Sequence, residues 1–485
     1  MRRRWMLLAV GCALVACSTS AGVSVRGSQT LDTGTVPVAP VSSVPSTSSN
    51  GADQPGDGVG DELFPGLGNP GVDVTNYDVQ LAFDPATEVL QATVVIDLTL
   101  TTDRQGITLD AAGPQIDSVV VDDQVVTFRQ DDPELRVSLP GPGHVGDQLR
   151  VTVAYHLSPQ SQESIVGLSN GWFNTVGGAY VLNEPDAAHT WLPCNDHPSD
   201  KATFTVAVTV PAGLTAIANG ELTDHHSEGA NEVWVWREQR PMTTYLMQLF
   251  VGDYQLVTGV GPHGLPLVSA VLRSDQLTMQ SSIDQIPAQI AFFERFFGAY
   301  PLDRYGIAIT DSSAGLAMET QERSYFSRDD FVQGPDQSLL AHELAHQWFG
   351  DAVSPQRWSD VWLNESFATY GEWMWMEHLG ELTVDEMAKE ALNGRYPGST
   401  AHPSAQELFG YNSYEGGAVV VHALRKELGD ELFFTLLQRW VAGYNGTSRT
   451  TEDFTALAEK VAGRSLSDFF AAWLYAAQTP SAFPQ

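Results

Sequence analysis

The segment Leu340-Ala-His-Glu-Leu-Ala-His-Gln-Trp-Phe-Gly350 constrains the fold more than any other part of this sequence. It contains the pattern H-E-x-x-H among apolar residues with helical spacing, and the glycine at its end is a natural stop for a helix. Positions i and i+4 share one helix face, so His342 and His346 can present two imidazoles to one metal ion, and imidazole suits zinc. Glu343 lies beside the first histidine, where its carboxylate can take a proton from a metal-bound water.

A third ligand must come from elsewhere in the chain, because a catalytic zinc site needs three protein ligands and an open position for water. The stretch Trp362-Leu-Asn-Glu-Ser-Phe-Ala-Thr-Tyr370 offers Glu365. We expect Asn364 to cap a second helix, with Glu365 in its first turn. A chance H-E-x-x-H, or a hydrogen-bonded pair of surface histidines, would not need this second helix. The combination therefore favours a zinc hydrolase with one metal ion per chain.

The N-terminal residues have the pattern of an export signal. Three arginines at positions 2–4 precede a short apolar run, Trp5 to Ala16, which is too short to span a bilayer well. Leu14-Val-Ala-Cys17 resembles a bacterial lipobox, in which Cys17 is lipidated and becomes the first residue of the mature protein. We expect residues 1–17 to be a lipoprotein signal peptide, and the lipid on Cys17 to anchor the protein to the outer face of a bacterial membrane. An ordinary signal peptide and a secreted protein are the alternative.

Residues 18–65 are rich in Ser, Thr, Pro and Gly and predict a disordered linker, because such a composition cannot form a core. The net charge of −34 excludes a nucleic-acid binder, since phosphate contacts need Lys and Arg. Of the three cysteines, Cys12 and Cys17 lie in the signal and leave Cys194 alone, so no intramolecular disulfide is expected after processing. We expect Cys194 to be a small buried residue.

The remaining sequence predicts an α+β protein with two domains. Alternation of apolar and polar residues predicts strands and an antiparallel β domain over residues 66–257. Apolar residues at helical spacing predict a second domain, residues 258–485, that begins with β and helix segments and then becomes helical. The expected strands include Tyr77–Phe83, Ala92–Leu100, Leu149–Tyr155 and Thr203–Val210, and the expected helices include Ile283–Phe297, Glu431–Val441, Thr451–Ala462 and Leu466–Tyr475.

The run from His342 to Asp351, followed by Trp362-Leu-Asn-Glu365, resembles the gluzincin zinc aminopeptidases of the aminopeptidase N and leukotriene hydrolase type. The resemblance covers residues 73–485 and implies a β domain followed by a thermolysin-like catalytic domain. Many family members continue into a helical-repeat domain, for which this sequence has no residues.

The first motif that the resemblance assigns to the substrate is Asn183-Glu-Pro-Asp186, followed by the stretch Trp191 to Phe204. In the family, the glutamate of this motif binds the α-amine of the substrate, and the resemblance gives this role to Glu184. A carboxylate near a metal is a sensible anchor for an ammonium group. Leu182 stands where the family has a glutamine.

The second motif is Leu316-Ala-Met-Glu-Thr320, which is similar to the G-A-M-E-N strand of the family. The resemblance implies that Glu319 also binds the α-amine and that the backbone of Ala317 and Met318 pairs with the peptide. Two carboxylates at a closed end leave room for one residue before the scissile bond, as in an exopeptidase.

The third motif, Tyr411-Asn-Ser-Tyr-Glu-Gly-Gly-Ala418, resembles the Y-x-K-G-A element of the family, with Gly416 in place of the basic residue. The resemblance gives Tyr414 the role of stabilising the oxyanion, and a phenol donor suits the charge that develops there. Tyr411 is a competitor for this role.

We therefore expect a zinc aminopeptidase that acts on peptides with a free N-terminus. A zinc endopeptidase or an epoxide hydrolase on the same scaffold is one alternative. A non-catalytic, peptide-binding surface lipoprotein with a structural zinc is another, although Glu343 argues against it because a structural site has no use for a general base.

Overall fold

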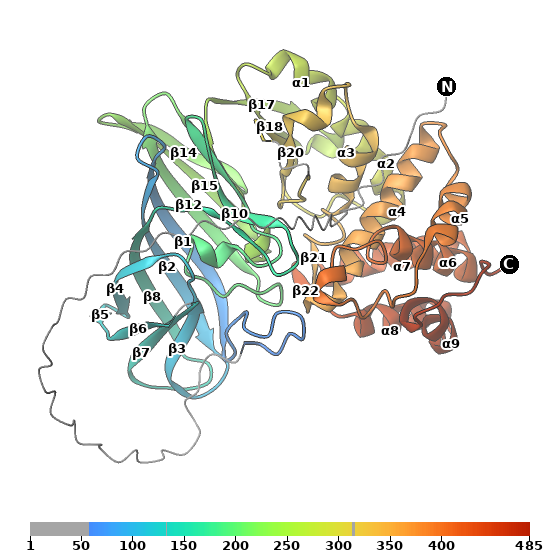
Figure 1. Cartoon of the computed structure of the whole chain (residues 1–485), viewed down its shortest axis with the longest axis horizontal. Helices are drawn as coiled ribbons and strands as arrows, with labels where there is room; N and C mark the ends of the chain where they lie inside the picture. Colours follow the sequence, from blue (N-terminus) through green and yellow to red (C-terminus); the bar gives the residue numbers. More distant parts are fainter. Residues whose placement is uncertain (1–57, 132, 313–315) are drawn as a thin grey trace, which may run out of the picture. The chain divides into compact units, whose positions relative to one another are not determined.

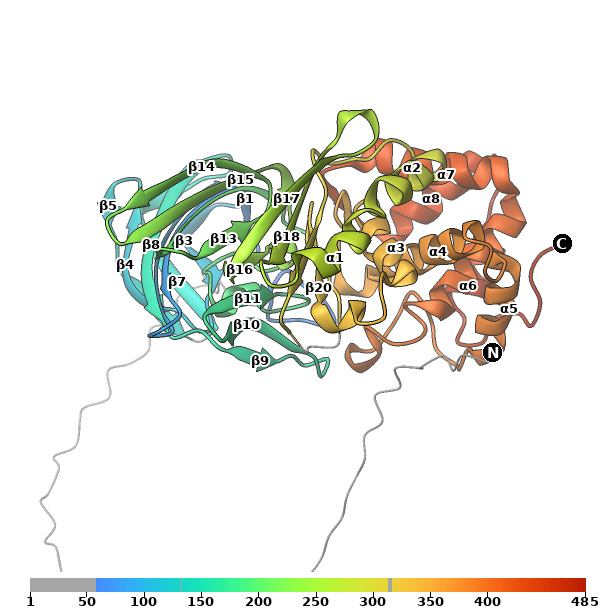
Figure 2. The same cartoon turned by 90° about the horizontal axis from the view of Figure 1, so that it is seen from above.

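The computed structural model describes residues 58–131, 133–312 and 316–485. Strands dominate the first half of the described chain, in blue to green in Figures 1 and 2, and helices dominate the second half, in orange to red. The predicted α+β class is confirmed. The predicted signal peptide, the predicted lipidation site Cys17 and most of the predicted linker lie outside the described residues. Within the described ranges, no helix is both long and apolar enough to cross a membrane.

An eight-stranded sheet forms the frame of the β-rich part. Its strands alternate buried and exposed side chains, as the sequence pattern predicts. All neighbours are antiparallel except β1 and β12, which pair in parallel, so the sheet is mostly antiparallel as predicted. The strand order is β14 (Glu221–Glu228), β15 (Asn231–Met242), β12 (Ala202–Pro211), β1 (Val72–Asp84), β2 (Val89–Leu100), β8 (Gln148–Leu157), β4 (Gln115–Val121) and β5 (Gln124–Val125).

Two smaller sheets complete this part. Strand β11 is buried along its whole length and ends at Leu182, so the turn that carries Glu184 emerges directly from the core. One sheet has the order β13 (Thr215–Ala218), β16 (Leu249–Gly252), β11 (Gly178–Leu182), β10 (Ser169–Thr175) and β9 (Ser161–Glu163), and the other has the order β3 (Arg104–Asp110), β7 (Glu134–Gly143) and β6 (Phe128–Asp131).

The second part of the described chain, which we predicted to be catalytic and call the catalytic part, begins with a four-stranded sheet in the order β17 (Tyr254–Val260), β18 (Pro266–Leu272), β19 (Ile307–Thr310) and β20 (Ser324–Ser327). The predicted domain boundary after residue 257 falls inside β17. A short parallel pair, β21 (Val353–Pro355) and β22 (Thr447–Arg449), lies further along the chain. The helices are α1 (Gln276–Ile283), α2 (Ile286–Phe297), α3 (Gln337–Ala345), α4 (Trp362–His378), α5 (Val384–Gly394), α6 (Glu415–Leu428), α7 (Asp430–Tyr444), α8 (Thr451–Ala462) and α9 (Ser467–Phe470).

The end of the predicted linker is packed in the structure. Asp61 and Phe64 are 2% and 3% exposed, and Phe64 belongs to the core of the β-rich part. The prediction of disorder up to residue 65 is therefore wrong for residues 58–65. Two glycines and a proline in this segment suggest a loop, but the anchoring contacts are made with residues far along the chain, which composition does not show.

Candidate active site

Helix α3 carries the two histidines at its C-terminal end. Asp336 caps the helix, because its carboxylate accepts the backbone N–H groups of Ser338 and Leu339, both at 3.1 Å. The helix ends at Ala345 with His346 as its C-cap, and tight turns then lead to Gly350, where φ is +130°. The helix is therefore shorter than predicted, although the H-E-x-x-H residues remain on one face. His342 and His346 are buried.

Helix α4 packs against α3 and brings Glu365 to the histidines. Its carboxylate oxygen Oε2 lies 3.4 Å from Nε2 of His342 and 3.4 Å from Nε2 of His346. Burial by itself raises the pKa of Glu365, but the two histidines outweigh it and lower this pKa to about 2. Two converging imidazoles and an ionised carboxylate are the ligand set of a catalytic zinc site, so these residues fit a zinc ion.

The start of α4 differs from the prediction. The helix begins at Trp362 with Val361 as its cap, so Asn364 lies inside the first turn instead of capping it. The side chain of Asn364 is buried and donates a hydrogen bond from Nδ2 to the hydroxyl of Tyr245 at 3.2 Å. Glu365 nevertheless lies in the first turn, as expected.

Each histidine has a partner on its other ring nitrogen. Nδ1 of His342 lies 3.5 Å from Oε2 of Glu372, and Nδ1 of His346 lies 3.1 Å from the carbonyl oxygen of Phe349. Such partners fix the ring so that Nε2 faces the metal. The sequence analysis missed Glu372, although it lies two turns after Glu365 on the same face of α4.

Glu343 faces the same space as the ligands. One of its carboxylate oxygens lies within 4.8 Å of ligand atoms of Glu319 and His346. Burial raises the pKa of Glu343 to about 8, against the opposing effect of the two histidines. Its oxygen Oε2 is buried and has no partner among the described residues, so it is available to a water or substrate proton.

Glu184 and Glu319 meet beside the metal ligands. Carboxylate oxygens of Glu184, Glu319 and Glu365 all lie within 4.8 Å of one another. Burial, followed by the charge of neighbouring carboxylates, raises the pKa of Glu184 well above its usual value. Oε1 of Glu184 and Oε1 of Glu319 are buried and lack partners among the described residues. A cation between these carboxylates would relieve their repulsion.

The strand predicted around Glu319 is reduced to one bridge. Both backbone polar groups of Met318 bond to Tyr325, at 3.0 Å and 2.7 Å. The backbone N–H and carbonyl of Met318 are thus engaged in this bridge, and the pairing of Met318 with a peptide stays a prediction. The direction of the backbone N–H and C=O groups alternates from residue to residue along an extended chain. The backbone groups of Ala317 therefore point away from Tyr325, toward the opposite edge.

Tyr414 lies next to the first histidine. Its ring stacks on His342 with centroids 5.9 Å apart and an angle of 14° between the planes. The competitor Tyr411 donates its hydroxyl to the carbonyl oxygen of Ala391 at 2.8 Å, which directs it elsewhere. The first turn of α6 follows Tyr414 and packs so closely on α4 that a Cβ at Gly417 would overlap Ser366.

The β-rich part also holds the turn that follows α3. The ammonium of Lys201 donates to the carbonyl oxygen of Asp351 at 2.6 Å and lies 3.4 Å from that of Ala352. Burial lowers the pKa of Lys201 to about 7. The sequence analysis did not single out this residue, because its partners are backbone atoms distant in the chain.

The fold and this site define a zinc metallopeptidase. Family models agree: the peptidase M1 N-terminal domain matches residues 74–246, and the peptidase family M1 domain matches residues 282–473. The chain belongs to peptidase family M1, and the resemblance seen in the sequence is confirmed.

Solved structures and curated relatives support this membership. The M1 zinc metallopeptidase from Deinococcus radiodurans is 30% identical, with a TM-score of 0.82 over 88% of this chain and 99% of that chain. A mutant of it was solved with Tyr-Ser-Ala substrate bound. Probable aminopeptidase 2 of Sulfurisphaera tokodaii is 27% identical over 83% of this chain and 53% of its own length. Leucyl aminopeptidase of Saccharolobus solfataricus is 26% identical, with the same coverage. The chain thus spans about half the length of these curated relatives.

Proposed function

We propose that the protein is a zinc aminopeptidase that removes the N-terminal residue from peptides. The observation that carries this proposal is the meeting of Glu184, Glu319 and Glu365 within 4.8 Å, with unpartnered oxygens on the first two. Glu365 serves the metal, which leaves two carboxylates for one cation. The ammonium group of a free N-terminus is a cation of the right size, and the names of the curated relatives are in keeping with this substrate.

The short distance between the amine anchor and the metal ligands supports an exopeptidase. When the ammonium lies between Glu184 and Glu319, the scissile carbonyl is that of the same, N-terminal residue. A peptide that continued in the N-terminal direction would place uncharged backbone against Glu184 and Glu319. The two buried carboxylates would then be desolvated without a cation to offset their mutual repulsion. The two buried carboxylates therefore disfavour an endopeptidase.

The chain's own residues have defined tasks in this reaction. Bound zinc supplies polarisation of a water molecule and of the peptide carbonyl. Glu343 accepts the water proton and passes it to the departing amine. Tyr414 donates its phenolic hydrogen to the developing oxyanion, and Glu372 holds the ring of His342. The availability of Glu343 also disfavours a purely peptide-binding protein.

The test is a panel of aminoacyl-arylamides and their N-acetylated counterparts, with and without a chelator. We expect cleavage of the free-amine substrates alone, lost with the chelator and restored by zinc. Equal cleavage of acetylated substrates would remove the anchor role of Glu184 and Glu319. Zinc binding without any cleavage would favour the peptide-binding alternative.

We also propose that the protein is exported and anchored to a membrane by a lipid on Cys17. The arginines at positions 2–4, the short apolar run and the sequence Leu14-Val-Ala-Cys17 support this. We expect wild-type protein in the membrane fraction with the mass of a lipidated chain, and a Cys17→Ser variant without the lipid. Release of the wild type into the medium as unmodified protein would instead identify an ordinary signal peptide.

A further inference from the structure

The position of Glu365 depends on the turn that precedes it. The residues Trp358–Asp360 form a single helical turn that runs directly into α4. The carbonyl oxygen of Val361 accepts the N–H groups of Asn364 at 2.8 Å and of Glu365 at 3.1 Å. The first turn of a helix has the fewest internal hydrogen bonds, so its orientation is set by what holds this preceding turn.

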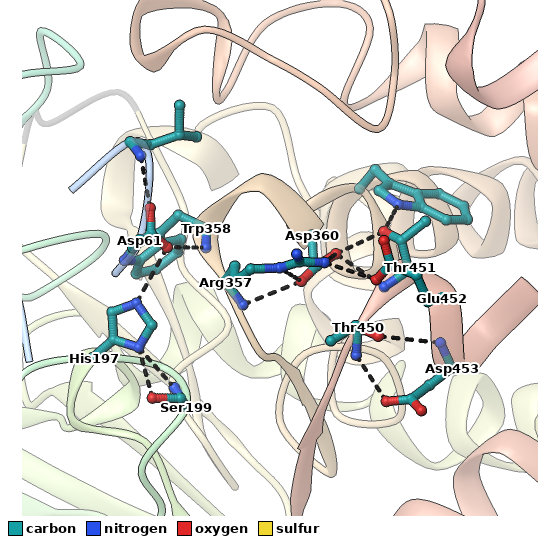
Figure 3. Close-up of polar contacts among 12 residues, drawn as sticks. Asp61, His197, Ser199, Arg357, Trp358, Asp360, Thr450, Thr451, Glu452 and Asp453 are labelled. Atoms are coloured by element: carbon teal, nitrogen blue, oxygen red, sulfur yellow. Dashed lines mark hydrogen bonds and ion pairs between the residues drawn. The ribbon is translucent and has the colours of Figure 1, made fainter. Parts of the chain in front are cut away.

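Two anchors hold the turn from different parts of the chain (Figure 3). Asp360 accepts the backbone N–H of Thr451 at 2.9 Å and its hydroxyl at 2.7 Å, which fixes the turn to the start of α8. Asp61 accepts the backbone N–H of Trp358 at 2.7 Å through Oδ2. The second anchor belongs to residues 58–69, which we call the N-terminal strap.

Asp61 is itself fully engaged. Its Oδ1 accepts the N–H groups of Leu63 at 2.8 Å and Phe64 at 3.1 Å, so the carboxylate also closes the loop of the strap. Its Oδ2 lies 3.2 Å from Nε2 of His197, and Nδ1 of this histidine lies 2.8 Å from the hydroxyl of Ser199. Asp61 and His197 are both 2% exposed, so water does not compete for these bonds.

Aromatic rings in contact connect the strap to α4, the helix that carries Glu365. The ring of Phe64 lies 5.8 Å from that of Trp358, and Trp358 lies 5.2 Å from Tyr245 in an edge-to-face arrangement. The hydroxyl of Tyr245 accepts the side-chain N–H of Asn364, the residue before Glu365. The strap therefore reaches the first turn of α4 both through the backbone of Trp358 and through its ring.

We propose that Asp61 is a positioning residue for the zinc site, which acts through Trp358 on the ligand Glu365. Without the carboxylate, the N–H of Trp358 loses its buried partner and the turn gains freedom. Glu365 then spends less time in the geometry that zinc requires, and the metal dissociates more readily. This inference rests on the zinc site and not on the class of substrate, so it stands or falls separately from the proposed peptidase activity.

The test compares Asp61→Ala with a matched control, Val153→Ala. Val153 is fully buried in β8 of the eight-stranded sheet, where it lies opposite Val94 of β2 and Val119 of β4. The zinc dissociation constant is measured by competition with a chromogenic chelator, and melting temperatures of the zinc-free proteins show how far each is destabilised. We expect zinc to bind about 10–100-fold more weakly to Asp61→Ala, the range seen when partners of metal ligands are removed. Val153→Ala should bind zinc like the parent.

Equal zinc affinity in Asp61→Ala and the parent would overturn the proposal, and so would equal weakening in both variants. If Asp61→Ala does not fold, His197→Leu and His197→Gln replace it. Leucine removes a donor to Asp61, whereas the glutamine amide can still donate. We expect zinc to bind several-fold more weakly to the leucine variant. The glutamine variant should bind zinc with nearly the affinity of the parent. Identical affinities in the two variants would contradict the positioning role.

Discussion

Burial places the carboxyl groups of this site in different protonation states. The histidines keep Glu365 ionised, with a pKa of about 2, whereas burial raises the pKa values of Glu343, Glu319 and Glu184. The difference follows from distance: Glu365 lies 3.4 Å from both imidazoles, whereas burial dominates at the other three carboxyl groups. One residue is thus prepared to bind a metal ion, and the others are prepared to accept a proton or a cation.

Glu343→Gln tests the proton acceptor. The amide has nearly the same shape but cannot accept the water proton, so kcat should fall by about 10²–10⁴-fold, the usual contribution of general base catalysis. Zinc content, measured by atomic absorption, should stay at one ion per chain because the three ligands remain. Retained kcat with full zinc content would show that another group takes the proton.

Glu319→Gln tests the amine anchor. A charge-assisted hydrogen bond contributes about 1.5–3 kcal/mol, so kcat/KM for a free-amine substrate should fall by roughly 10–100-fold. The preference over the acetylated substrate should shrink by the same factor. An equal loss on both substrates would indicate damage to the metal site instead of a lost anchor.

Helices at the site depend on short segments just outside them. Helix α4 starts from the turn that Asp61 and Asp360 hold, and α3 is followed by a turn whose carbonyl groups bond to Lys201. Both supports come partly from the β-rich part. The positions of α3 and α4, which carry the metal ligands, therefore depend on contacts with the β-rich part as well as on the catalytic part.

Lys201→Met removes the support after α3 while keeping the length of the side chain. The carbonyl oxygen of Asp351 then loses its charged donor, and the buried carboxylate of Asp351 loses the positive charge nearby. We expect a loss of about 1–3 kcal/mol in unfolding free energy, measured by urea denaturation. Arg150→Met, which breaks an exposed ion pair with Asp97, serves as the comparison and should change little. Equal effects would refute a special role for Lys201.

Local signals predicted elements well, and long-range contacts decided the rest. Helix α8 has the predicted bounds because its Thr450 cap is a local feature of the sequence. The start of α4 was misplaced because the turn at Trp358–Asp360 is held by Asp61 and Thr451, which are distant in sequence. The bridge at Met318 and the contribution of Lys201 depend likewise on tertiary partners. The two histidine ligands were predictable because their i, i+4 spacing reflects one helix face, and Glu365 was predictable from its place in the first turn of the next helix.

At the scale of the molecule, the β-rich and catalytic parts share a core. The large hydrophobic cluster of the β sheets includes Met318, Tyr325, Trp358 and Leu408 from the catalytic part. When either part unfolds, the apolar surface that it buries on the other part becomes exposed to water, which destabilises the other part as well.

We therefore expect the two parts to unfold together. Scanning calorimetry of the zinc-free protein should show one transition, and circular dichroism signals from helices and strands should change at the same temperature. Two separated transitions would mean that the shared core contributes little.

Acid should weaken the attachment of the strap. Burial tends to raise the pKa of Asp61, but hydrogen bonds from His197 and Trp358 prevail and lower it below its ordinary 3.8. A lowered carboxyl pKa stabilises the fold above the ordinary value, and this stabilisation is lost as pH falls through the folded pKa. The difference in melting temperature between the parent and Asp61→Ala should thus be constant near neutrality and shrink below about pH 4. A difference that does not decrease below about pH 4 would contradict this.

The strap also sets an order of events during folding. The hydrogen bond from Trp358 to Asp61 joins residues 297 positions apart. The parallel pairing of β1 with β12 likewise joins segments that are distant in the sequence. Contacts between such distant residues close large loops and form late. The N-terminal end of the described chain should therefore be among the last segments to settle. High-affinity capture of zinc would then report that folding is complete, and an immature chain would release the ion.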